Sequence, residues 1–227
     1  MENQLLKVSH LIQLFLFIII LIATIIGFLY KKRIGFYSIF TILTSFALTQ
    51  LIVSNYLYFL YGAKKSLDLI NLSINIFLII ELFIISVFFY SRLKSENLKK
   101  IITYLNGPLW ITLFIILIID SNYITVHYGF FASTEAIIIL LNCIFLFIEI
   151  LDDDSDTSLS DSPDFIITAG YFFFFSFTCP FYMLYSYIKY SNPIFLISFY
   201  IINDLGYLIL YFLITKAYLC QIRINKL

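Results

Sequence analysis

The sequence has 227 residues, of which 62% are hydrophobic and 12% are charged, and its formal net charge is +0. Soluble domains are typically about half apolar and about a quarter charged, so this chain lacks the polar residues needed to cover a water-soluble core. The composition therefore excludes an ordinary soluble enzyme and favours a protein whose solvent is the lipid bilayer. The neutral charge gives no reason to expect a nucleic-acid partner.

Seven apolar runs follow one another along the chain, at residues 10–30, 36–60, 69–91, 101–120, 133–151, 165–188 and 194–217. Each is about 20 residues long, which is enough for one helical crossing of a bilayer. Because the connections are short, consecutive helices are expected to be antiparallel neighbours. The predicted fold class is all-α: a polytopic bundle of seven transmembrane helices that forms a single domain over residues 1–227, with no soluble domain.

The distribution of basic residues predicts the orientation. The first apolar run ends in Lys31, Lys32 and Arg33 without a small-residue cleavage pattern, so we expect a retained helix rather than a signal peptide. Lys and Arg concentrate in cytoplasmic loops, and ten of the 14 fall on the cytoplasmic side if the N-terminus is outside. The sequence thus predicts a multi-pass protein of the cell inner membrane, with its N-terminus outside and its C-terminus cytoplasmic.

The connection at residues 152–164 carries six acidic residues and no basic residue. Like charges repel one another, so we expect a solvated, flexible loop. Two alternatives stay open. Every second residue from Asp152 to Asp156 matches the first ligand positions of an EF-hand calcium loop, although Thr157 and Pro163 stand where Gly and Glu are needed. The loop could instead dock a basic cytoplasmic partner.

Polar residues recur within three of the predicted helices. The third helix carries Asn71, Asn75 and Glu81, the fifth carries Glu135 and Asn142, and the seventh carries Asn203, Asp204, Tyr207 and Tyr211. Their spacing at 100° per residue gathers them toward one side of each helix. This predicts a polar interior between helices three, five and seven that binds a small ligand or a proton. The alternative is that these residues only hold helices together, since interhelical hydrogen bonds contribute about 0.6–2 kcal/mol each in lipid.

Two of these acids lie deep in the predicted bilayer. Glu81 and Asp204 fall near mid-depth, whereas every Lys, Arg and His lies in a loop or at a helix end. A bare carboxylate in hydrocarbon is disfavoured by several kcal/mol. We therefore expect these acids to be protonated, to share a proton, or to hold a cation or the ammonium group of a ligand.

Motifs for metal binding or catalysis are weak. His10, His127 and Asp120 fall on the predicted outer side, where they form a weak candidate metal or pH-sensing site. The three cysteines form no CxxC pair, so neither a zinc site nor a disulfide framework is indicated. Because the sequence contains no nucleophile–base pair and no phosphate-binding loop, no cofactor is expected, and an enzyme is the less favoured interpretation.

Scattered residues carry a likeness to a known family. They are the run Glu81-Leu-Phe-Ile-Ile-Ser, the start Ser133-Thr134-Glu135, and Pro163, Phe165, Ile167, Gly170, Phe175, Ser176, Asn203 and Tyr211. On these residues the chain resembles a large, uncharacterised family of small bacterial seven-helix integral membrane proteins. Gln50, Ile166 and Tyr207 depart from the family pattern, which has Glu, Trp and Asn there. The resemblance implies a membrane sensing role, by association with sensor kinases.

Three functional hypotheses follow. The favoured one is a membrane sensor or signalling accessory that binds a small ligand or proton and acts through a cytoplasmic partner such as a sensor kinase. The second is a small proton-coupled transporter, which needs a water path past Glu81 and Asp204. The third is an intramembrane lipid hydrolase of the lysoplasmalogenase type, which needs paired carboxyl groups in a cavity open to lipid.

Overall fold

The computed structural model describes residues 2–120, 128–152, 159–191 and 193–225, and these residues form helices and short connections without a strand. Within these described residues, seven helical spans are long and apolar enough to cross a membrane. The predicted all-α class and the seven membrane-compatible helices are therefore confirmed. We treat the chain accordingly as a multi-pass membrane protein.

The elements follow in the order α1 (Glu2–Leu29), α2 (Lys31–Ile34), η1 (Gly35–Ser38), α3 (Ile39–Arg92), α4 (Glu96–Ile119), α6 (Tyr128–Leu151), η2 (Leu159–Asp161), α7 (Pro163–Ser191) and α8 (Pro193–Ile224). Several helices begin a few residues before the apolar run predicted from the sequence, and their first turn contains polar residues. Before α4, for example, the Ser95 hydroxyl accepts the backbone N–H of Leu98 at 3.5 Å. Such a cap satisfies a free donor of the first turn, so the helix starts earlier than hydropathy predicts.

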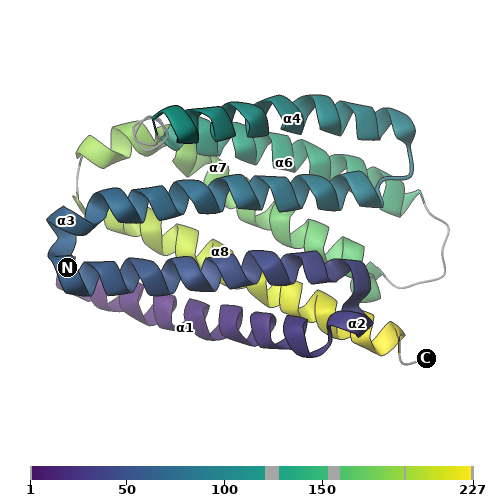
Figure 1. Cartoon of the computed structure of the whole chain (residues 1–227), viewed down its shortest axis with the longest axis horizontal. Coiled ribbons are helices and arrows are strands. Elements are labelled where there is room, and N and C mark those ends of the chain that lie inside the picture. The colour runs from purple at the N-terminus through teal and green to yellow at the C-terminus, as the bar shows by residue number, and fades with distance from the viewer. Residues whose placement is uncertain (1, 121–127, 153–158, 192, 226–227) are drawn as a thin grey trace.

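The long element α3 is a hairpin rather than a straight rod. A straight helix of its 54 residues would be about 80 Å long, yet the ring centroids of Phe40 and Phe88 lie 5.1 Å apart. Figure 1 shows the ribbon folding back on itself, so α3 supplies two antiparallel arms. Together with α2 they provide the spans Lys31–Val53 and Leu72–Arg92. Hydropathy predicts a connection at residues 61–68 between two runs, whereas these residues are helical and belong to α3.

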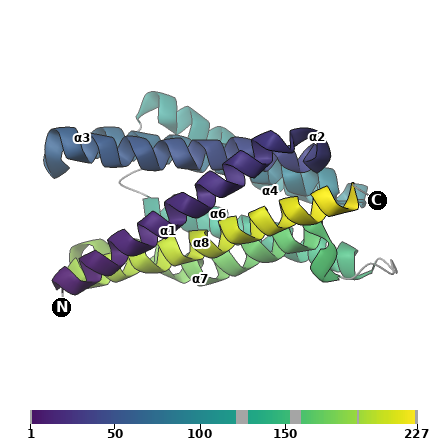
Figure 2. The ribbon, with the colours of Figure 1, turned by 90° about the horizontal axis from the view of Figure 1, so that it is seen from below.

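The seven spans pack as a bundle with its termini at opposite ends (Figure 1). α7 contacts both α6 and α8, while α1 contacts α8 and α3. Figure 2 shows α1 starting beside α8 near the N-terminus and reaching α3 at its other end. α4 lies on the outside against α3 and α6. The centre of the bundle is therefore enclosed by α3, α6, α7 and α8.

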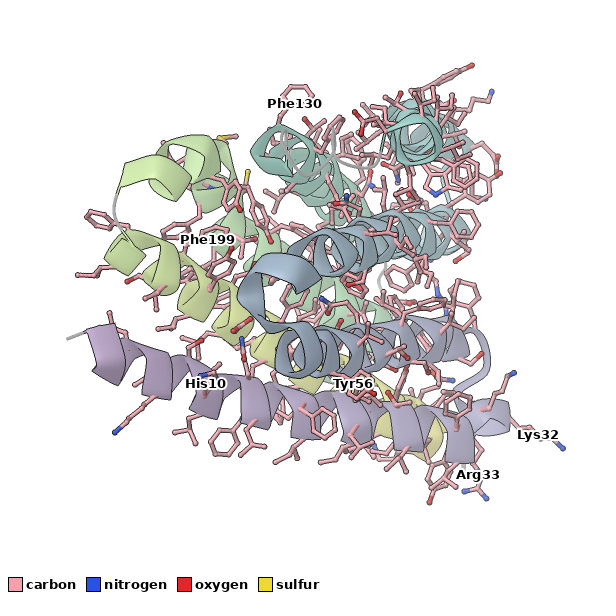
Figure 3. The ribbon with its side chains drawn as sticks, turned by 60° about the vertical axis from the view of Figure 1, so that its left-hand side comes forward. His10, Lys32, Arg33, Tyr56, Phe130 and Phe199 are labelled. Atoms are coloured by element: carbon pink, nitrogen blue, oxygen red, sulfur yellow. The ribbon has the colours of Figure 1, made fainter. Side chains whose placement is uncertain are left out.

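Apolar side chains fill the interior and also cover the outside. The largest fully buried side chains include Phe40, Phe88, Phe89, Tyr171, Phe174, Tyr211 and Tyr218. On the outside, Phe130 is 67% exposed and Ile118 is 70% exposed. Figure 3 shows Phe130 at the outer edge of the bundle, and it shows Lys32 and Arg33 at the other end of the first helical span from His10. An apolar outer surface of this extent fits a lipid environment rather than water.

The acidic connection is only partly a loop. Residues 153–158 lie outside the described part of the chain, which leaves most of the EF-hand comparison outside it as well. Asp161 forms an ion pair with Arg223, and Asp164 forms one with Arg92 at 2.9 Å. The helix ends thus bring arginines of α3 and α8 beside the start of α7, while the Asp161 side chain stays 51% exposed.

Candidate functional site: a buried carboxyl pair

Glu81 lies in the second arm of α3, near the middle of the span Leu72–Arg92. Its side chain is only 3% exposed. The Tyr207 hydroxyl of α8 donates a long hydrogen bond to Glu81 Oε2 at 3.4 Å. Glu81 Oε1 is buried and has no hydrogen-bond partner among the described residues. One oxygen of this carboxyl group is therefore left for a proton, a water or a ligand.

Glu135, in the second turn of α6, faces the same region. It is also 3% exposed, and it lies within electrostatic range of Glu81. Its Oε1 atom is buried and has no hydrogen-bond partner in the described part of the chain. No described Lys, Arg or His forms an ion pair with either acid. We call Glu81 and Glu135 the carboxyl pair.

Two buried tyrosines lie near Glu81 of the carboxyl pair. Tyr171 of α7 is 0% exposed and Tyr211 of α8 is 1% exposed. Both lie within electrostatic range of Glu81. Neither hydroxyl has a hydrogen-bond partner among the residues that the structure describes. These two hydroxyl groups are thus further polar groups available to an occupant of the site.

Tyr171 was not among the residues predicted from sequence, although a signal for it existed. Asp164, Thr168, Tyr171, Thr178 and Tyr182 recur at steps of three, four and seven residues along α7. That spacing defines one face of a helix. The many Phe residues between them hide the pattern, because they make the run read as uniformly apolar.

Asn142 of α6 forms a second polar contact in the interior. Its amide nitrogen donates to the Asn106 oxygen of α4 at 3.1 Å, and both side chains are buried. Asn106 Nδ2 and Asn142 Oδ1 have no hydrogen-bond partner in the described chain. Asn142 lies two helical turns from Glu135, so this pair is a separate contact between α4 and α6.

Other predicted site residues lie in different contacts. The Tyr182 hydroxyl donates to Asn203 Oδ1 at 2.7 Å, which joins α7 to α8. The Gln13 amide donates to Asp204 Oδ2 at 3.4 Å, which places the Asp204 carboxylate at the boundary between α1 and α8. Glu81 and Asp204 therefore have different partners, because Asp204 and Tyr207 point from α8 toward different neighbouring helices.

The remaining candidates are less informative. Asn75 is buried. The side chain of Asn71 is not among the side chains that the structure describes. His10 and Asp120 are exposed, and His127 lies outside the described residues. No group of three or more His, Cys, Asp or Glu side chains in the described ranges could hold a metal ion.

The chain was compared with protein-family models, curated proteins and solved structures, and none of them matches. Its class therefore rests on its own architecture, which is a seven-span membrane bundle with two acidic groups in its interior. The donors around the carboxyl pair are carboxylate and phenol oxygens. Such hard oxygen donors suit a proton, a compact inorganic cation or an ammonium group.

Proposed function

We propose that this protein is a membrane sensor or signalling accessory whose carboxyl pair binds a proton or a compact cation. The supporting observation is that Glu81 and Glu135 are each 3% exposed and lie within electrostatic range of one another. The proposal places the N-terminus outside and the C-terminus in the cytoplasm of a bacterial inner membrane. A cytoplasmic partner such as a sensor kinase would receive the signal.

Simple electrostatics supports an occupant between the two acids. A single charged side chain at the centre of a bilayer is disfavoured by about 2.5–3.5 kcal/mol or more. A second like charge nearby adds repulsion, which is strong where the dielectric constant is low. One proton or one monovalent cation held by the pair lowers its charge from −2 to −1, which removes the repulsion between the two carboxylates. The remaining charge is removed only when a second proton or cation binds. Occupancy of the pair is therefore coupled to how closely α3 and α6 pack.

The experiment is infrared spectroscopy of the protein in lipid nanodiscs, with Na⁺, K⁺ or NH₄⁺ as the added cation. A shared proton gives a carbonyl band of a protonated carboxyl group, and Glu81→Gln and Glu135→Gln each remove it. A bound cation instead gives carboxylate bands that shift with the added ion. Glu96→Gln is the matched control because Glu96 is exposed and pairs with Lys99.

The proposal is wrong if neither band responds to the two variants or to the ions. A sensing role further requires that occupancy changes the end of the bundle that a cytoplasmic partner would contact. Backbone hydrogen exchange at residues 93–100, the link into α4, measures that change. Equal exchange with and without the occupant would remove the sensing part of the proposal and leave only binding.

The carboxyl pair also favours a second candidate, an intramembrane hydrolase acting on lipid. One carboxyl group can donate a proton while its neighbour accepts one from water, which is the arrangement of general acid–base catalysis. Incubation with lysophospholipid and plasmalogen-derived lysolipid vesicles, followed by mass spectrometry, tests this candidate. Product that is formed by the natural chain and by Glu96→Gln, but not by Glu81→Gln, would favour the hydrolase over the sensor.

A further inference from the structure

We infer that a row of buried hydroxyl groups on α7, α8, α3 and η1 forms a proton route between the carboxyl pair and the end of the bundle where α7 begins. We call this row the hydroxyl route; its members are Tyr171, Tyr211, Tyr218, Thr41 and Tyr37. The inference rests on the proposed function in its proton-binding form. It adds the path by which the proton arrives and the end of the bundle from which it comes.

The inner part of the hydroxyl route begins at Glu81. Tyr171 and Tyr211 are within electrostatic range of Glu81, and Tyr218 is within range of both tyrosines. All three phenol rings are at most 1% exposed. The Tyr171 and Tyr211 hydroxyls have no hydrogen-bond partner among the described residues. Ordered water molecules in protein interiors bind to buried hydroxyl groups that lack another partner. Each such water needs two to four polar partners.

The middle of the route joins α8 to the first arm of α3. Tyr218 lies two helical turns beyond Tyr211, which corresponds to about 10 Å along α8. The hydroxyl groups of Tyr218 and Thr41 lie 3.3 Å apart, and either can be the donor. Thr41 is only 5% exposed. The step from Tyr218 to Thr41 is therefore a direct contact. The inferred route needs bridging waters at two other steps, from Tyr211 to Tyr218 and from Thr41 to Tyr37.

The outer part of the route reaches solvent at a polar cluster. Tyr37 lies one helical turn before Thr41, and its hydroxyl donates to Asp164 Oδ1 at 2.8 Å. The same carboxylate oxygen pairs with Arg92 Nε at 2.9 Å. The Arg92 and Asp164 side chains are 26% and 27% exposed. Asp164 can therefore exchange a proton with water and stands at the outer end of the hydroxyl route.

The proton transfer balances at each step. The Tyr37 O–H bond points outward to Asp164, so it first rotates inward when Asp164 takes up a proton. Each hydroxyl oxygen then accepts a proton from its outer neighbour and releases its own proton to its inner neighbour. Each phenol is neutral before and after the transfer, and rotation of the O–H bonds resets the row. The net change is one proton taken from water at Asp164 and one O–H bond formed on the carboxylate of Glu81. No electron moves, and no oxidant or reductant is needed.

Charged and titratable groups of α3, η1, α6, α7 and α8 lie along this path. Glu81 meets Glu135 from α6, Tyr171 from α7, and Tyr207 and Tyr211 from α8. Cys143 of α6 lies within electrostatic range of Tyr171. Asp164 meets Arg92 and Tyr37. The Arg92 cation holds the Asp164 carboxylate at the mouth of the route and opposes entry of other cations.

The test is the rate at which the protonated carboxyl band shifts when nanodiscs are moved from H₂O to D₂O. Tyr218→Phe and Thr41→Val keep the shape of the side chain and remove one hydroxyl each. We expect each to slow the exchange by about tenfold or more, with the size of the band unchanged, because the barrier to proton transfer rises. Thr41→Ser restores the hydroxyl and should restore the rate.

Tyr182→Phe is the matched control, because it also removes a buried tyrosine hydroxyl but one that bonds to Asn203, away from the route. It should exchange at the natural rate. Exchange that is equally fast in Tyr218→Phe, Thr41→Val and the natural chain would overturn the hydroxyl route while leaving proton binding intact. Absence of the carboxyl band in the natural chain would overturn proton binding itself, and the route with it.

Discussion

The carboxylate of Glu149, near the end of α6, accepts the backbone N–H of Ser95 at 2.8 Å and that of Lys94 at 2.6 Å. It thereby ties α6 to the short link between α3 and α4. Backbone donors just before a helix have no partner within the helix, and the helix dipole favours a negative charge there. A single side chain thus holds three of the seven spans in place at this end of the bundle.

Replacing Glu149 should loosen this end of the bundle. Glu149→Ala removes both acceptors, and we expect the free energy of unfolding to fall by about 1–3 kcal/mol, the usual range for lost charge-assisted hydrogen bonds. Glu149→Gln keeps one acceptor oxygen and should lose less. Thermal unfolding in detergent, followed by near-ultraviolet circular dichroism, measures the difference. Glu96→Gln, at an exposed pair with Lys99, should leave the midpoint unchanged, and a Glu149→Ala midpoint equal to that control would contradict the prediction.

The hydrogen bond between Asn106 and Asn142 supports a second prediction. Removing one partner by Asn142→Leu leaves the other amide buried without its partner, which is more costly than the bond itself is stabilising. We expect each single Leu variant to lose about 0.6–2 kcal/mol in lipid. The double variant Asn106→Leu with Asn142→Leu should recover most of that loss, because both polar groups are then gone. Stability losses that simply add in the double variant would show that the two amides act independently.

Hydropathy was sufficient to predict the number of spans. Seven apolar runs of about 20 residues leave one architecture in a bilayer, since every backbone polar group there must be bonded within a helix. The third run also pointed to Glu81, because an acid in mid-span is conspicuous against its neighbours. These are local properties of the sequence, so they could be read without knowing which helices touch.

The contacts between helices could not be predicted in the same way. Glu81 and Asp204 looked equivalent in depth, yet one bonds to Tyr207 and the other to Gln13. Which neighbour a side chain meets depends on helix rotation and crossing, and these are set by packing across the whole bundle. The many Phe and Ile residues on every side of each helix leave little apolar asymmetry from which rotation could be inferred.

The cluster around Arg92 leads to a third prediction. Its guanidinium pairs with Asp164 and lies 4.7 Å and 4.6 Å from the ring centroids of Phe36 and Tyr37. Lys cannot reproduce this planar arrangement because its ammonium group is compact and does not stack. Arg92→Lys should therefore lower the thermal unfolding midpoint although the charge is kept. The exposed Arg223, which pairs with Asp161, is the control, and an equal effect of Arg223→Lys would contradict the role assigned to stacking.

Gly27 of α1 packs against Thr41 of α3, and this contact leads to the last prediction. A Cβ atom added at Gly27 would lie 2.2 Å from Thr41 Oγ1, 2.7 Å from its Cγ2 and 2.9 Å from its Cβ. Rotation of the Thr41 side chain does not move its Cβ, so the two helices must shift apart. Overpacking of this kind costs about 1–3 kcal/mol, and we expect Gly27→Ala to lower the unfolding free energy by that amount.

Gly107 in α4 offers a matched control, because a Cβ there meets no atom within 4 Å. Gly107→Ala should leave stability unchanged or raise it by up to about 1 kcal/mol, since alanine favours the helix. Thr41→Ala removes two of the three close atoms at Gly27, so the double variant Gly27→Ala with Thr41→Ala should be more stable than Gly27→Ala alone. Calorimetry of the natural chain, Gly27→Ala, Thr41→Ala and the double variant gives the coupling between the two positions. If Gly27→Ala unfolds at the same temperature as Gly107→Ala, α1 and α3 do not approach as closely as the structure has them, and the Thr41 hydroxyl loses its defined place beside Tyr218.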